Sequence, residues 1–176
     1  MESTEQIIKT FLETKGYLVL NNHKVKLDKN LILDLDIVAI REKGSEKDGL
    51  PNRIIGEVKS WALHPSHFEK FYKKKNLKFA RTLFDRLKYI NNEVYRKKVI
   101  SYVNKRYGKN FKLAIFAQGI TKKYESELLR FLKKEKIVFV PHKKIVEYLI
   151  KNTNESTYID DPIIQFIRLM KKNKIN

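Results

Sequence analysis

Charged residues inside two predicted strands restrict most strongly how this chain can fold. Asp36 stands near the start of the apolar run 35–40, and the run 54–61 carries Glu57 and Lys59. Side chains alternate between the two faces of a strand, so Glu57 and Lys59 point the same way and Val58 points to the opposite face. Burying charges among apolar residues is costly unless a partner uses them. A divalent metal ion would use the carboxylates, and a phosphodiester would give Lys59 a partner.

The composition fits one globular domain with a core of its own. The chain has 176 residues, of which 42% are hydrophobic and 33% are charged. The absence of cysteine excludes disulfides, zinc–thiolate sites and iron–sulfur clusters. We find no signal peptide and no apolar run long enough to cross a membrane, so we expect a cytoplasmic protein that does not contact membranes.

The positive charge of the chain is large and unevenly distributed. The formal net charge is +18, and residues 66–109 alone hold 14 Lys and Arg against 3 acidic residues. A lysine-rich composition spread evenly along the chain would not concentrate charge in this way. Such an excess favours a polyanionic partner, most often nucleic acid, and we expect DNA or RNA.

Hydrophobic spacing predicts alternating helices and strands. Ser66, followed by Glu69 three residues later, predicts a capping box that opens a helical region reaching about residue 107, with breaks near Asn76 and Asn92. The other predicted helices cover residues 4–15, 121–134, 143–151 and a segment beginning at Asp161-Pro162, and the predicted strands cover residues 17–20, 31–40, 53–61, 111–117 and 137–140. Val25 and Leu27 extend the first strand or pair with it.

This order of elements indicates an α/β domain with a mixed central β-sheet flanked by helices. We expect residues 1–152 to form that domain, with a basic helical insertion at 66–109. Residues 153–176 form a C-terminal tail and helix that would dock on the domain or on a second copy of the chain.

These residues resemble the PD-(D/E)XK nuclease superfamily, which has the restriction-endonuclease-like fold. Asp36 on its apolar strand matches the Asp motif, and Glu57-Val58-Lys59 on the next strand matches the E-x-K motif. An early helix that begins with Glu5 is similar to the layout of archaeal Holliday-junction resolvases and Mrr-type enzymes. Leu35 stands where the superfamily often has proline. The motifs cover roughly residues 4–60, and the later elements agree by their order only.

The resemblance implies a metal-dependent endonuclease that hydrolyses phosphodiester bonds. Asp36, Glu57 and the carbonyl of Val58 would hold Mg²⁺ or Mn²⁺ through hard oxygen ligands. Lys59 would orient or deprotonate the attacking water and offset negative charge, and Glu5 would serve as an auxiliary ligand. The resemblance also implies a homodimer, because cutting two strands requires two sites.

Each of these roles has an alternative in the sequence. Asp34 competes with Asp36, which we favour because its apolar continuation is longer. A glutamate such as Glu5 in a first helical turn is favourable to the helix dipole in any case, and Glu13 is the other acidic candidate in that helix. Glu57 and Lys59 would also suit an ion pair on an edge strand, which contributes little to stability.

Two short basic runs are the predicted contacts with nucleic-acid backbone, and the tyrosines of residues 66–109 could stack on unpaired bases. The runs are Lys73, Lys74, Lys75 and Arg96, Lys97, Lys98. We recognise no base-reading motif and no separate recognition domain, so we expect a structure-specific substrate such as junction or branched DNA. The alternative functions are a non-catalytic nucleic-acid-binding protein and a sequence-specific restriction-type endonuclease.

Overall fold

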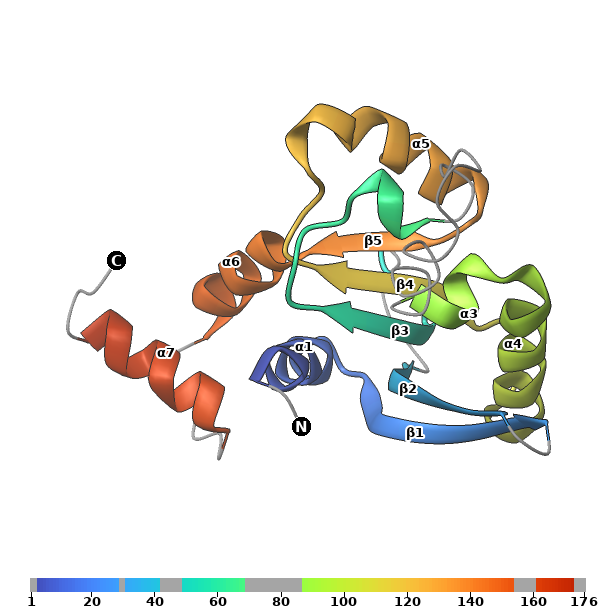
Figure 1. Ribbon diagram of the computed structural model, residues 1–176. Coiled ribbons are helices and arrows are strands. Elements are labelled where there is room, and N and C mark those ends of the chain that lie inside the picture. Colours follow the sequence, from blue (N-terminus) through green and yellow to red (C-terminus); the bar gives the residue numbers. More distant parts are fainter. Residues whose placement is uncertain (1–2, 29–30, 42–48, 69–86, 154–160, 173–176) are drawn as a thin grey trace.

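A five-stranded sheet with the strand order β1-β2-β3-β4-β5 forms the centre of the molecule (Figure 1). The computed structural model describes residues 3–28, 31–41, 49–68, 87–153 and 161–172. None of the helices in these ranges is both long enough and apolar enough to span a membrane.

The sheet is mixed, as the sequence predicts. Its strands are β1 (Leu18–Asp28), β2 (Leu31–Ile40), β3 (Arg53–Lys59), β4 (Lys112–Ala117) and β5 (Val138–Pro141). Strand β2 is antiparallel to both β1 and β3, whereas β3, β4 and β5 are parallel to one another. The first strand is longer than predicted, because it runs without interruption through Val25, and β3 ends at Lys59 instead of Trp61.

Helices cover both faces of the sheet. One hydrophobic cluster joins the sheet to α1 (Ser3–Thr14), α6 (His142–Asn152) and α7 (Pro162–Lys172). A second cluster joins the other face to α3 (Lys88–Asn91), α4 (Glu93–Tyr107) and α5 (Glu125–Lys134). Each fully buried aliphatic or aromatic side chain stabilises this arrangement by roughly 1.5–3 kcal/mol. The α/β class with a mixed sheet between helical layers is therefore confirmed.

Strand β3 lies between these two cores and is buried along most of its length. Ile54 and Val58 contribute to the cluster around α1, and Ile55 contributes to the cluster around α3. A Cβ atom at Gly56 would lie 2.8 Å from Phe116 Cε2, so glycine is needed for β3 to approach β4 this closely. The close packing fixes the position of the residue that follows, Glu57.

The predicted capping box at Ser66 is wrong. Ser66 lies inside a short 3₁₀ turn, η2 (Pro65–His67), whose N-cap is His64, and Phe68 after it has extended backbone. The imidazole of His64 takes the capping role because its Nδ1 accepts a hydrogen bond from the Ser66 amide. The predicted break at Asn92 is confirmed, since its side chain caps α4 by accepting from the amides of Val94 and Tyr95. Asn76 lies outside the described residues.

The last helix, α7, is attached to the domain at its first turn. Asp161 accepts hydrogen bonds from the amides of Ile163 and Ile164, and Pro162 occupies the first helical position as predicted. The hydroxyl of Thr10 in α1 donates to the same carboxylate at 2.7 Å. One aspartate therefore both caps α7 and links it to α1.

Candidate active site

Strands β2 and β3 are bridged at Asp36 by a side chain. Their pairing runs from Ile40, opposite Arg53, to Ile37, opposite Gly56. One residue further along, Asp36 Oδ2 accepts a 2.7 Å hydrogen bond from the backbone amide of Val58. The carboxylate thus takes the place of a main-chain acceptor, and this charge-assisted bond fixes its position relative to β3.

Lys59 lies between the two carboxylates at this end of β3. Its Nζ atom is 2.5 Å from Glu57 Oε1 and 3.9 Å from Asp36 Oδ2. The Glu57 side chain is 8% exposed, and those of Lys59 and Asp36 are each 18% exposed. Two acidic groups therefore share one ammonium group in a site largely shielded from water.

The ammonium group of Lys59 does not fully compensate the negative charge of the buried Glu57 carboxylate. Burial raises the pKa of the Glu57 carboxyl, and the nearby charge of Asp36 raises it further, whereas Lys59 and the Tyr89 hydroxyl lower it. The result is a pKa of about 7 instead of the ordinary 4.5. Glu57 consequently takes up a proton near neutral pH unless another cation stabilises its charge.

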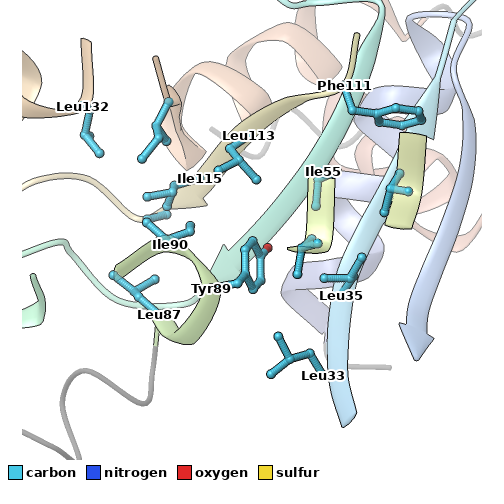
Figure 2. Close-up of a cluster of buried hydrophobic side chains, with 14 of the residues drawn as sticks. Leu33, Leu35, Ile55, Leu87, Tyr89, Ile90, Phe111, Leu113, Ile115 and Leu132 are labelled. Carbon is cyan, nitrogen blue, oxygen red and sulfur yellow. The ribbon is translucent and has the colours of Figure 1, made fainter. Parts of the chain in front are cut away.

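Tyr89, a residue of the helical layer, lies beside Glu57. Its side chain is 2% exposed and lies among Leu35, Ile55, Leu87 and Ile90 in the core (Figure 2). Its hydroxyl is close enough to Glu57 to lower the pKa of that carboxyl, although the contact falls short of strict hydrogen-bond geometry. Burial and the neighbouring carboxylates raise the pKa of Tyr89 itself, so the phenol stays protonated. This buried tyrosine therefore cannot stack on bases, and sequence reasoning missed its contact with Glu57.

Glu5 contacts strand β1 and not the carboxylate pair itself. Its Oε2 accepts a hydrogen bond of 3.5 Å from the side-chain amide of Asn22 at the surface. Asn22 has a positive φ of 50°. Its two neighbours in β1 pair with Ile37 and Leu35, which are the two neighbours of Asp36 in β2. The first turn of α1 is thus directed towards the segment that carries Asp36.

The alternative acidic residues lie elsewhere. Asp34 is exposed and pairs in register with Lys24 of β1. Glu13 is bound by Lys9 one helical turn earlier, at 3.7 Å. The structure therefore brings Asp36, and neither of these two residues, together with Glu57 and Lys59.

The site offers two carboxylates to a cation. Among the residues that the structure describes, no three His, Cys, Asp or Glu side chains gather closely enough to hold a metal ion. Asp36 and Glu57 supply hard oxygen atoms of the kind that Mg²⁺ and Mn²⁺ prefer, as does the carbonyl of Val58, the residue after Glu57, and Mg²⁺ commonly keeps several water ligands. The cation already held here, the Lys59 ammonium, shows that the pair attracts positive charge.

The histidines after β3 serve the local turn. His64 Nδ1 accepts from the Ser66 amide at 3.1 Å, and His67 Nδ1 accepts from the His64 amide at 3.0 Å. These ring nitrogens stabilise η2 and are not directed at the carboxylate pair.

The predicted backbone-binding residues differ in their surroundings. Arg96 forms an ion pair of 3.1 Å with Glu135, and Lys97 pairs with Glu93 at 2.8 Å on the exposed side of α4. Lys98 is half-buried, and Lys73, Lys74 and Lys75 lie outside the described residues. Near the end of α4, Lys105 and Arg106 are exposed, and the guanidinium of Arg106 donates to the Tyr107 hydroxyl.

Together, these observations define an α/β domain with a five-stranded mixed sheet and two carboxylates joined by a lysine at one end of its central strand. No protein-family model, no curated protein and no solved structure matches this chain. The chemistry of the site must therefore be inferred from the geometry of these residues.

Proposed function

We propose that this chain is a metal-dependent deoxyribonuclease of the restriction-endonuclease-like fold that hydrolyses phosphodiester bonds. The proposal is supported by the order of the elements, in which a helix and three antiparallel strands precede further helices and a parallel strand. The two middle strands carry Asp36, Glu57 and Lys59 at the positions that the superfamily resemblance implies.

The observation that carries the proposal is the charge balance at Glu57. Its carboxyl is buried beside Asp36, and its pKa remains near 7 even with Lys59 at 2.5 Å. A charge arrangement that only stabilised the fold would be compensated more fully, because an uncompensated buried carboxylate is costly. A divalent cation would supply the missing positive charge.

Asp36, Glu57 and the Val58 carbonyl would hold Mg²⁺ or Mn²⁺. Such an ion, when bound, polarises a phosphate and lowers the pKa of a coordinated water molecule. The Val58 amide keeps Asp36 oriented, and Tyr89 faces Glu57 from the helical layer that contains α3. Lys59 would donate to the water or to a phosphate oxygen and offset negative charge there. Glu5 would assist from α1.

The substrate we propose is branched or otherwise structure-specific DNA. The exposed cations Lys105 and Arg106 suit contacts with phosphates, which position a nucleic acid without reading its sequence. Homodimerisation is part of the same proposal. Phe166 and Leu169 of α7 are 60% and 57% exposed, and sedimentation at micromolar concentration would test whether a second copy associates there.

Cleavage of labelled DNA tests the proposal directly. Linear, single-stranded, flapped and four-way substrates are incubated with Mg²⁺ or Mn²⁺, with and without chelator. We expect metal-dependent cleavage that Lys59→Ala and Glu57→Gln abolish and that Lys122→Ala, at an exposed lysine outside the site, leaves unchanged. Absence of cleavage by the wild type, or full activity of Lys59→Ala, would contradict the assignment.

Two other outcomes correspond to the alternative functions. Salt-sensitive binding of DNA without cleavage under any metal condition would indicate a non-catalytic nucleic-acid-binding protein. Discrete product bands from long duplex DNA would indicate a sequence-specific restriction-type enzyme.

A further inference from the structure

A lysine-lined hollow lies at the opposite end of the parallel strands from the carboxylate pair. It has a volume of about 480 Å³, and Lys112, at the start of β4, lines it. The strand register places Lys112 beside Ile54, whereas Lys59 lies beside Ala117. The five residue-to-residue steps from Ile54 to Lys59 span about 16 Å of strand, so the hollow is separate from the proposed active site.

The charged residues that the structure describes at this hollow are lysines. Lys112 of β4, Lys133 in the last turn of α5 and Lys136 after that helix all line it, and none of the described lining residues is acidic. Glu135, between the latter two in sequence, is held by Arg96 at 3.1 Å. The Glu135 carboxylate is thus bound to Arg96, and three lysines of like charge line the hollow, where an anion would reduce their mutual repulsion.

Lys136 occupies a position where lysine is unfavourable for the backbone. Its φ is +57°, and α5 ends there in a Schellman motif, with the amides of Lys136 and Ile137 bonded to the carbonyls of Lys133 and Leu132. Glycine is favoured at this position because other residues strain in the left-handed region. A lysine at this position adds a third ammonium group to the lining of the hollow, although it ends the helix less favourably than glycine would.

The walls of the hollow are apolar. Leu50 and Ile137 are 5% and 4% exposed, and Pro51 and Val138 complete the lining. A second hollow of about 270 Å³ shares Leu50 and Val138 with the first, and the charged residues described in its lining are again lysines, Lys15 and Lys144. Apolar walls with a few charged groups are typical of sites for small ligands that have both an apolar and a charged part.

We propose that this hollow binds a phosphate-bearing nucleotide unit. The three ammonium groups would bind the phosphate, and the apolar walls would contact the sugar or base. The unit could be a free nucleotide or the 5′-phosphorylated end of a nucleic-acid strand, which present the same chemistry. This inference does not depend on the proposed nuclease activity.

Titrations followed by amide NMR, in chelator and at physiological salt, test the proposal. The probes are 5′-AMP, adenosine and inorganic phosphate, together with a trinucleotide with and without a 5′-phosphate. We expect saturable shifts at Leu50, Ile137 and Val138 with AMP, and affinity at least about tenfold weaker for adenosine and for phosphate alone. A trinucleotide that binds more tightly than AMP only when it is phosphorylated would identify a strand end as the ligand.

Two triple variants distinguish a specific binding site from non-specific attraction to positive charge. Lys112→Gln/Lys133→Gln/Lys136→Gln should weaken AMP binding at least about tenfold, whereas Lys24→Gln/Lys122→Gln/Lys151→Gln, with the same change in charge, should not. Lys136→Gly should lower the affinity while leaving the melting temperature at or above that of the wild type, so a folding defect would not explain the loss. Equal effects of the two triple variants, or unchanged binding by Lys136→Gly, would overturn the proposal. Glu57→Gln should bind AMP normally, which keeps the outcome distinct from that of the nuclease proposal.

Discussion

The phenol of Tyr89, on the short helix α3, faces the carboxylate of Glu57, on the central strand, inside the hydrophobic core. As whole residues, Glu57 is 6% exposed and Tyr89 is 2% exposed. The contact connects β3, the strand that carries the proposed catalytic residues, with the helical layer that contains α3 and α4. It also gives Glu57 a second polar neighbour besides Lys59.

Tyr89→Phe removes this hydroxyl and preserves the ring. Because the hydroxyl lowers the pKa of Glu57, the variant should have a Glu57 pKa further above 7 and weaker affinity for Mn²⁺, by about threefold to tenfold. Carbon-detected NMR titration of the glutamate carboxyls and calorimetric Mn²⁺ titration measure the two effects. Leu87→Ala, which perturbs only packing in the same cluster, is the control. An unchanged Glu57 pKa in Tyr89→Phe would show that the hydroxyl does not act on this carboxyl.

Glu57 should make the metal-free protein less stable as the pH rises. Its folded pKa of about 7 exceeds its ordinary value of 4.5, so the folded state binds the proton more tightly. The resulting stabilisation is complete below pH 4.5 and is lost as the pH rises through 7, by about 3 kcal/mol in total. Urea unfolding in chelator at pH 5 and pH 8 measures the change.

Glu57→Gln provides the comparison for this pH dependence, because glutamine resembles the protonated carboxyl. The variant should lack this part of the slope and should be more stable than the wild type at pH 8 without metal. The half-buried His142, whose pKa is lowered by desolvation, contributes a slope of the opposite sign in both proteins and therefore cancels in the comparison. Identical slopes for Glu57→Gln and the wild type would contradict the raised pKa.

Because side chains alternate along a strand, the grouping of Glu57 and Lys59 could be predicted from the sequence. Glu57 and Lys59 are two residues apart on one strand, so they share a face wherever that strand lies. The longer apolar continuation after Asp36 distinguished it from Asp34, which the structure places at the surface beside Lys24. These inferences needed only local geometry.

Contacts between distant segments could not be predicted in this way. Tyr89 is 32 positions beyond Glu57, and Arg96 and Glu135, which form an ion pair, are similarly far apart in sequence. No local pattern indicates such pairings, because they depend on how the helical layer packs on the sheet. The error at Ser66 has a different, local cause, because His64, two residues earlier, accepts the hydrogen bond from the Ser66 amide.

Asp36→Asn tests which aspartate serves the site. Asparagine can still accept the hydrogen bond from the Val58 amide, so the fold should persist while the negative charge is lost. We expect cleavage to fall by at least about a hundredfold, as the loss of several kcal/mol of charge stabilisation requires. Asp34→Asn should retain activity within about twofold, because Asp34 is exposed and lies outside the group. A greater loss in Asp34→Asn than in Asp36→Asn would reverse the assignment of these two residues.

Gly56→Ala should destabilise the protein through the close contact between β3 and β4. The added methyl would lie 2.8 Å from Phe116 Cε2 and 3.2 Å from Ile37 Cβ, so a core side chain or the strand itself must shift. Overpacking of this kind typically costs about 1–3 kcal/mol, and here it should also displace Glu57, the next residue. Urea unfolding measures the loss of stability, and calorimetric titration measures the accompanying loss of Mn²⁺ affinity. Gly119→Ala is the matched control, because no atom lies within 4 Å of a Cβ there. Equal stability of the two variants would mean that β3 and β4 are packed less tightly than described. Wild-type Mn²⁺ affinity in Gly56→Ala would show that the site tolerates movement of its central strand.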